Sequence, residues 1–339
     1  MALKFKEPHI IKATYRIVTP MFIGDAEQNA TGISPQSVKG ALRFWWRALM
    51  WGKIRAAIAS DRVALQHLHT EEAKLFGSSA ENGQAAAFTL RVPDHKSISI
   101  TRATDWPNGR PNDSSSYLGL GLWRLGNQPQ REYIRENQKF AVELVATAKV
   151  TTEQQQQLRD ALTAWGLFGG LGSRTRRAFG AIAIETLGTE SFAFAQVSDY
   201  QKAVSKLLTN YRLASVKQPP FSAFSIAAQF SISSQSDNDA RRAHAALGTL
   251  FKNYRGLSTS PVRGSKKKVF GMPYAGGNKQ EGEARRASPL LFHVHPIGTR
   301  FVGATLFLPA LFHHDPALAT VEYPLAKAFL QQLPQAVLV

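Results

Sequence analysis

Residues 34–49, SPQSVKGALRFWWRAL, predict one helix with two different faces. Ser34 is a favourable N-cap, and Pro35 suits the first helical position, where a missing N–H costs little. An apolar stripe recurs at helical spacing: Val38, Leu42, Trp45 and Leu49. A second stripe, at i, i+4 and i+8, is basic: Lys39, Arg43 and Arg47. We call these three residues the basic stripe.

The basic stripe has no carboxylate on its own helix, and the nearest acids in sequence are Glu27 and Asp61. Gly40 lies inside the helix, where glycine costs about 1 kcal/mol relative to alanine. Such a glycine suggests that a backbone or a ligand comes close. Two interpretations stay open: a solvated cationic face, or a face that holds an anion.

The elements around this helix predict a β-α-β-β-α-β order. Residues 103–130 are rich in Pro, Gly, Asn and Ser and predict an irregular insertion. The predicted elements are a strand over 11–25, the helix from 34, strands near 86–92 and 139–148, a capped helix over 151–169 and a strand over 180–188. This order matches a ferredoxin-like fold.

The second half repeats the pattern more weakly. A helix over 197–213 and a Pro-containing linker lead to a strand, a helix, a strand pair and a helix, with no clear last strand. We therefore predict an α+β protein with two ferredoxin-like (RRM-like) domains that carry glycine-rich loops and insertions. The predicted divisions are an N-terminal domain over 1–190, a connecting helix and linker over 191–218, and a C-terminal domain over 219–339.

Charge favours a polyanionic partner. The 339 residues include 41 Lys and Arg against 24 Asp and Glu, a net charge of +17, and such a field attracts nucleic acid first and an anionic membrane second. The absence of cysteine excludes disulfides, thiolate zinc sites and cysteine nucleophiles. No signal peptide and no apolar stretch long enough to span a bilayer is evident. We expect a cytoplasmic protein with no membrane partner.

Two further segments are basic and rich in glycine. Residues 169–180, GGLGSRTRRAFG, place Arg174, Arg176 and Arg177 where the backbone can approach a phosphate and the guanidinium groups can bind its oxygens. No Walker A spacing is present. Residues 261–290 interleave Phe270 and Tyr274, which could stack on bases, with many cations. From this segment we predict phosphate contacts by Arg263, Lys266, Lys267, Lys268, Arg285 and Arg286. The alternative for both segments is a loop whose cations face solvent and bind no ligand.

Catalytic patterns are poor. His293 and His295 share one face of a strand, but no third metal ligand stands at a family spacing. Asp25 and Glu27 in a loop could act as a general base, yet loop acids are common. We predict no metal, no cofactor and no catalytic residue.

Four motifs in this order resemble a known family: TPMFIGDAEQ, SPQSVKGALRFWWRAL, GGLGSRTRRAFGAI and FGMP with RRASPL. They are similar to the RAMP proteins that form the first-numbered Cmr subunit of type III-B CRISPR effector complexes. RAMP loops often close with a glycine-apolar-glycine element, whereas here Ala181 and Ile182 follow Gly180.

The resemblance implies a non-catalytic RNA-binding subunit that caps the end holding the 3′ region of the guide RNA and the paired target RNA, beside other Cmr-type RAMP subunits. We predict that the basic stripe and both glycine-rich segments line one groove between the domains. One alternative is a metal-independent RAMP endoribonuclease that processes CRISPR RNA. A membrane-surface protein is disfavoured, because no amphipathic helix with an exposed apolar face is evident.

Overall fold

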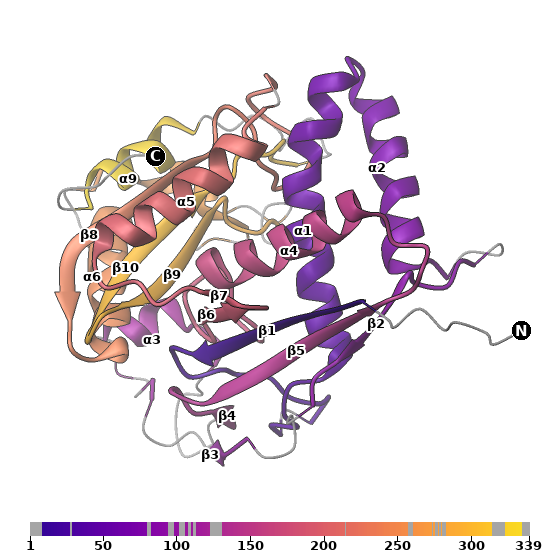
Figure 1. Cartoon of the computed structure of the whole chain (residues 1–339). Coiled ribbons are helices and arrows are strands. Elements are labelled where there is room, and N and C mark those ends of the chain that lie inside the picture. The colour runs from indigo at the N-terminus through magenta and orange to yellow at the C-terminus, as the bar shows by residue number, and fades with distance from the viewer. Residues whose placement is uncertain are drawn as a thin grey trace, which may run out of the picture.

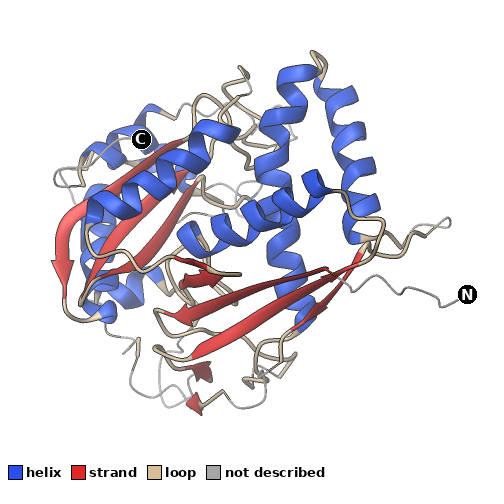
Figure 2. Cartoon of the chain, viewed as in Figure 1, coloured by secondary structure: helices blue, strands red, loops and turns tan. Residues whose placement is uncertain are grey.

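The computed structural model holds two antiparallel sheets with helices packed between and around them (Figure 1, Figure 2). It describes residues 9–27, 29–79, 83–93, 98–101, 106–107, 110, 113–122, 131–213, 215–256, 260–272, 274, 277, 279, 283–313 and 323–333. No helix in this part of the chain is long and apolar enough to cross a membrane.

The first sheet confirms the predicted β-α-β-β-α-β order. Its strands lie in the order β2-β5-β1-β6-β7, and every neighbouring pair is antiparallel. Tyr15 at the centre pairs with Phe140 on one side and Ile184 on the other. The elements are β1 (His9–Ile17), α1 (Pro35–Ala57), β2 (Phe88–Arg91), β5 (Lys139–Ala146), α4 (Thr152–Phe168), β6 (Ile182–Leu187) and β7 (Glu190–Ser191).

The two long helices of this unit begin where their capping residues predict. Ser34 Oγ accepts a hydrogen bond from Ser37 N at 3.1 Å, with Pro35 in the first turn of α1. Thr151 and Gln154 form a capping box at the start of α4. Both helices then bury their apolar stripes in one core.

One helix was not predicted. α2 (Asp61–Phe76) begins at Ser60, which caps it, and lies beside α1 (Figure 1). Leu68 and Leu75 are buried on its inner face. This helix brings a carboxylate to α1.

The insertion over 103–130 is only partly irregular. Its described residues include α3 (Ser114–Leu118), which begins at Asp113 and packs against α6 (Ala240–Gly256) of the second half. A short pair, β3 (Ile100–Thr101) and β4 (Tyr133–Ile134), flanks it. The insertion therefore connects the two halves.

The second sheet has the order β8-β10-β9 and the predicted β-α-β-β-α sequence of elements. As expected, no further strand joins it among the described residues. Besides α6, its elements are β8 (Gln229–Asp237), η1 (Gly264–Phe270), β9 (Leu290–Ile297), β10 (Arg300–Phe307) and α9 (Pro324–Gln331).

The two sheets share one apolar core. α4 contacts strands of both sheets, and α5 (Val197–Tyr211) lies across the second. Phe168 of α4 meets Phe230 of β8 with ring centroids 5.2 Å apart, and Tyr200 of α5 meets the same ring at 5.7 Å. The structure is thus two ferredoxin-like units packed on each other, and the domain boundaries at 190 and 219 stay a prediction.

Candidate nucleic-acid interface

The basic stripe is not unpaired, contrary to what the sequence of its own helix suggests. Glu72 of α2 accepts a hydrogen bond from Arg43 Nε at 2.7 Å and lies 3.5 Å from Arg47 Nε. Arg47 is still 45% exposed, whereas the Glu72 side chain is only 8% exposed. Lys39 makes no hydrogen bond or ion pair with a described residue, and burial together with the charge of Arg43 lowers its pKa. Phosphate contacts by these three residues stay a prediction.

Neighbours of the stripe divide between core and surface. Trp45 and Trp46 are both buried, and Trp46 Nε1 donates to Gln157 Oε1 at 3.1 Å. Gly40 is exposed, and a Cβ added there would meet no atom within 4 Å. No described backbone segment approaches this glycine, so the expectation of a close backbone contact is wrong.

The glycine loop between α4 and β6 is held by unusual backbone conformations. Gly172, Arg174, Ala178 and Gly180 have positive φ angles of 91°, 60°, 62° and 60°. A Cβ on Gly180 would lie 2.1 Å from Leu171 O. The loop therefore needs glycine at this position, and it turns its three arginines in different directions.

Only Arg174 of the three loop arginines is exposed. Its Nη2 donates to Leu120 O, and burial together with Arg131 lowers its pKa. Arg176 and Arg177 are partly buried against the second unit. The three arginines that were predicted to bind phosphates therefore lie in three different environments.

Arg176 connects the glycine loop to two other segments of the chain, one at Ser222 and one at Ser288. Its Nη1 donates to Ser288 O at 2.8 Å and its Nη2 to Ser222 Oγ at 3.3 Å. Its guanidinium carbon lies 5.4 Å from the centre of the Phe44 ring, within cation–π range. Burial, with Arg286 nearby, lowers the pKa of Arg176 to about 10, so the group stays charged at neutral pH.

Arg177 inserts between aromatic rings of the second unit. Its guanidinium carbon lies 4.7 Å from the Phe251 ring centre and 5.2 Å from that of Phe292. Its Nη2 donates to Phe270 O at 3.2 Å. Burial, and next the charge of Arg255, lower its pKa to about 9.

The loop residues of the second unit also differ from one another in solvent exposure. Arg263 and Lys266 are exposed, Lys267 and Lys268 partly so, and Arg285 is exposed while Arg286 is partly buried. Phe270 and Tyr274 are 3% and 8% exposed and belong to the core. The expectation that these two rings stack on bases is wrong, because they already pack against protein.

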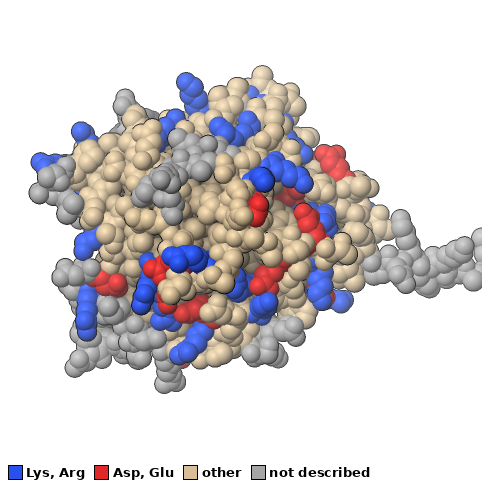
Figure 3. Space-filling model, turned by 60° about the vertical axis from the view of Figure 1, so that its left-hand side comes forward, with Lys and Arg blue, Asp and Glu red and all other residues tan. Residues whose placement is uncertain are grey.

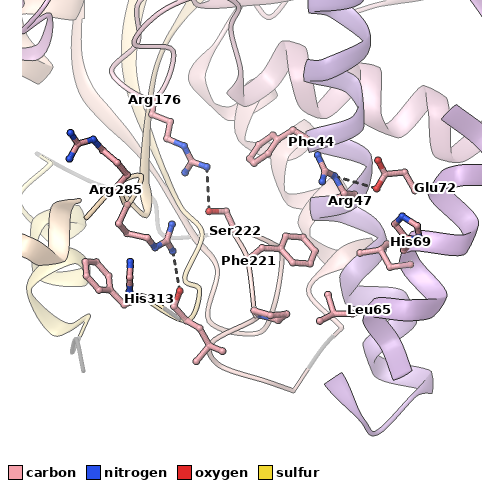
Figure 4. A pocket seen from close by; sticks show the side chains of 15 residues that line it. Phe44, Arg47, Leu65, His69, Glu72, Arg176, Phe221, Ser222, Arg285 and His313 are labelled. Atoms are coloured by element: carbon pink, nitrogen blue, oxygen red, sulfur yellow. Dashed lines mark hydrogen bonds and ion pairs between the residues drawn. The ribbon is translucent and has the colours of Figure 1, made fainter. Parts of the chain in front are cut away.

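Two adjoining hollows run between the units. A hollow of about 670 Å³ includes Phe44, Arg47, Glu72 and Phe221 in its lining, with His69 and His313 on opposite sides (Figure 4). A second, of about 870 Å³, contains no carboxylate among its described lining residues. Its cations are Arg174, Arg176, Arg177, Arg255, Lys267, Arg285 and Arg286.

Arg176, Arg285 and Arg286 line both hollows, so they form one interdomain groove. The predicted residues that line a hollow are Arg47, Arg174, Arg176, Arg177, Lys267, Arg285 and Arg286. The others line neither hollow: Lys39, Arg43, Arg263, Lys266 and Lys268. On the face shown in Figure 3, basic side chains are scattered among acidic ones and do not gather in one patch.

Arg255, at the end of α6, is a groove residue that was not predicted. Its Nη1 donates to Tyr117 OH at 3.1 Å. A lone arginine in the last turn of a helix is an ordinary sequence feature, so only the packing of α3 on α6 reveals it.

His293 and His295 are core residues, whereas Asp25 lies at the surface. His293 Nε2 lies 3.1 Å from His295 Nδ1, and both rings are buried at 1% exposure. Among the described residues, no group of three potential ligands could hold a metal ion. Asp25 is exposed, and its Oδ1 accepts from Asn29 N at 2.9 Å.

Comparison with known proteins identifies the family. The family model of the RAMP superfamily matches residues 14–183, which contain α1 and the glycine loop. The chain belongs to the RAMP superfamily. The expected family is therefore confirmed.

Individual RAMP relatives extend the likeness. The chain is 27% identical over 185 residues to the CRISPR system Cmr subunit Cmr1-2 of Pyrococcus furiosus, which is 50% of this chain and 92% of the relative. The crystal structure of apo Cmr1 from Pyrococcus furiosus matches with a TM-score of 0.64 at 18% identity, over 97% of this chain and 98% of that one.

A chain in the cryo-EM structure of the type III-B Cmr-beta complex bound to cognate target RNA matches with a TM-score of 0.56 at 11% identity, over 96% of this chain and 99% of that one. At these identities the solved structures show that the RAMP fold is shared along nearly the whole chain.

Proposed function

We propose that this RAMP protein is a non-catalytic RNA-binding subunit of a type III-B CRISPR complex. It holds the 3′ region of the guide RNA and the paired target RNA at one end of a row of Cmr-type subunits, in the cytoplasm. The groove between its two ferredoxin-like units is the RNA path.

The observation that carries this proposal is the charge of the groove. Cations from both units line it, and no described carboxylate lines its larger hollow. Contacts to phosphates supply most of the affinity for RNA and little sequence information. Such a groove suits a complex whose target is set by the guide sequence and not by the protein.

The comparisons support the proposal from a second direction. The relative in Pyrococcus furiosus is a Cmr subunit of a CRISPR system, and the Cmr-beta complex was solved with cognate target RNA. Both features are properties of those proteins, and we extend them to this chain because it shares their fold and belongs to the RAMP superfamily.

The decisive experiment is RNA binding by the full chain across a salt series. Arg47→Gln, Lys267→Gln and Arg285→Gln together remove three accessible groove charges, and Lys202→Gln with Lys206→Gln on exposed positions of α5 is the control. The groove variant should bind more weakly, with a salt slope lower by about 0.7 per lost contact to single-stranded RNA. An equal loss in the control variant would refute the groove as the RNA path.

The contribution of Lys39 needs a separate variant. Replacing Arg43 and Arg47 together would leave the buried Glu72 carboxylate without its partners. Lys39→Ala alone avoids this problem, and we expect it to reduce RNA affinity and the salt slope by one contact. An unchanged salt slope would mean that Lys39 faces solvent and makes no contact with RNA.

The non-catalytic assignment is tested with the pure protein and CRISPR repeat RNA in the presence of a chelator, where we expect intact RNA. The alternative, a metal-independent endoribonuclease, has one observation in its favour, because His69 and His313 line the same hollow as Arg47. Cleavage that disappears in His69→Ala or His313→Ala would establish that alternative. Cleavage lost in Asp25→Ala would equally overturn the non-catalytic assignment.

A further inference from the structure

The larger hollow contains arginine nitrogens that donate to no described group. Arg177 Nη1, Arg255 Nε and Arg286 Nε are closed off from solvent and make no hydrogen bond to the protein. All three residues line the hollow. A buried N–H group without an acceptor costs free energy, and more so when it carries charge.

Charge at this place is unbalanced as well. Arg255 is the strongest charged neighbour of Arg177, followed among the cations by Arg174 and Arg176. Tyr117 OH accepts a hydrogen bond from Arg255, and among the described residues it is the one group that raises the pKa of Arg177. Among described residues no carboxylate stands between the two guanidinium groups.

Other arginines of this chain have carboxylate partners. Arg43 and Arg47 share Glu72, and Arg241 Nε donates to Glu136 Oε1 at 2.6 Å. The fold therefore pairs arginines with acids on neighbouring elements at those places. The Arg177–Arg255 junction is built differently, because no described carboxylate lines the hollow there, and an anionic ligand would supply the counter-charge.

We propose that Arg174, Arg177 and Arg255 form a seat for one phosphate group at the junction of the two units. Arg174 and Arg177 belong to the glycine loop of the first unit, and Arg255 belongs to α6 of the second. Guanidinium groups bind phosphate oxygens through forked, charge-assisted hydrogen bonds. A phosphate bound there supplies the missing negative charge and joins the units.

This inference deepens the proposed function, because an RNA phosphate is one source of the group and free inorganic phosphate is another. Binding to the folded state alone raises the unfolding temperature. The seat therefore makes the stability of the empty protein depend on an anion, independently of any RNA.

The test is thermal unfolding of the full chain in low-millimolar inorganic phosphate against chloride, at matched ionic strength and pH. We expect phosphate to raise the unfolding temperature of the wild type and of Arg242→Gln, an exposed arginine of α6 that does not line the hollow. In Arg255→Gln the apparent phosphate affinity should fall about tenfold, because a charged hydrogen-bond donor is lost. Arg255→Lys should recover part of it.

A structural role for Arg255 predicts a different result in chloride alone. If the arginine only held the fold, Arg255→Gln would unfold at a lower temperature than wild type with or without phosphate. The seat predicts an equal or higher unfolding temperature in chloride, because the variant removes a like charge beside Arg177. A lower temperature in chloride, or the same phosphate shift in both proteins, overturns the proposal.

Competition between RNA and phosphate separates the two sources. Phosphate that displaces RNA shows that an RNA phosphate occupies the seat, and phosphate that stabilises without displacing RNA shows that the seat takes the free anion. A wild type that responds to phosphate but binds no RNA keeps the seat and refutes the proposed function. A wild type that binds RNA but does not respond to phosphate keeps the proposed function and refutes the seat.

Discussion

Arg43 of α1 donates from Nε to the buried Glu72 of α2 at 2.7 Å, so two adjacent helices share one ion pair at the edge of the interdomain groove. Glu72 also lies 3.5 Å from Arg47. One carboxylate thus reduces the positive charge that two arginines present to a ligand. The affinity of the proposed RNA site should therefore depend on this acid as well as on its cations.

Glu72→Gln should tighten RNA binding while lowering stability. The amide keeps the shape of the side chain but frees Arg47 and removes a negative charge from the lining of the groove. Because both arginines are about a third exposed or more, the lost pairing should cost only about 1 kcal/mol of unfolding free energy. Urea unfolding and RNA titration at low and high salt measure the two effects.

Glu71→Gln is the matched control, because Glu71 precedes Glu72 on α2 and pairs with Lys74 at 2.7 Å. It should leave both quantities nearly unchanged. Weaker RNA binding by Glu72→Gln would contradict the prediction and would mean that Glu72 holds Arg47 in its binding position.

Gly40→Ala should stabilise the protein and weaken RNA binding. Gly40 is solvent-exposed and lies between the two ends of α1, and a Cβ added there would meet no atom within 4 Å. Alanine is better than glycine in a helix by about 1 kcal/mol. If RNA approaches the helix next to Lys39, the added methyl group obstructs it. Stabilisation with full RNA affinity would show that the ligand passes elsewhere.

Gly180→Ala should destabilise the glycine loop strongly. Its φ of +60° is unfavourable for alanine, and the new Cβ would stand 2.1 Å from Leu171 O. We expect a loss of more than about 2 kcal/mol in unfolding free energy. Gly188→Ala is the control, because its φ of +61° is similar but its nearest atom is Arg159 Nη1 at 3.7 Å. Equal losses in the two variants would disprove a role for the close contact.

Buried histidines should make the protein sensitive to acid. Burial lowers the pKa of His244 to about 4 and that of His293 to about 3. The unfolded chain, with ordinary histidine pKa values near 6.5, therefore binds more protons than the folded one. Their contribution is complete above about pH 6.5 and is lost as the pH falls toward 4, by about 1.4 kcal/mol per pH unit for each histidine.

Urea unfolding between pH 7 and pH 4.5 tests this dependence. His244→Gln should reduce the slope of unfolding free energy against pH by the contribution of one histidine. The variant also loses the contacts of His244 with Ser115 Oγ and Arg177 O, which lowers stability at every pH alike. Replacement of the exposed His67 by Gln should leave the slope as it is. A flat curve in the wild type would contradict the burial argument.

Much of the fold was predictable because it depends on local patterns. The Ser34 cap and the capping box at Thr151 start α1 and α4, and the order of strands and helices follows from hydrophobic periodicity. α2 has comparable local signals, including Ser60 and buried positions at Leu68 and Leu75, and close attention to its periodicity would have found it. Its consequence, the pairing of Glu72 with α1, could not be read from either helix alone.

The sequence by itself determined the two ferredoxin-like units, the excess of positive charge and the family, because each rests on residue types at fixed spacing along one segment. Only the tertiary structure decided which cations line the groove and which groups surround them. Arg177 packs against Phe251 of α6, Arg47 meets Glu72, and Arg255 meets Tyr117 of an insertion. These partners lie far apart in the chain, and the environment of a charge depends on whatever folding places beside it.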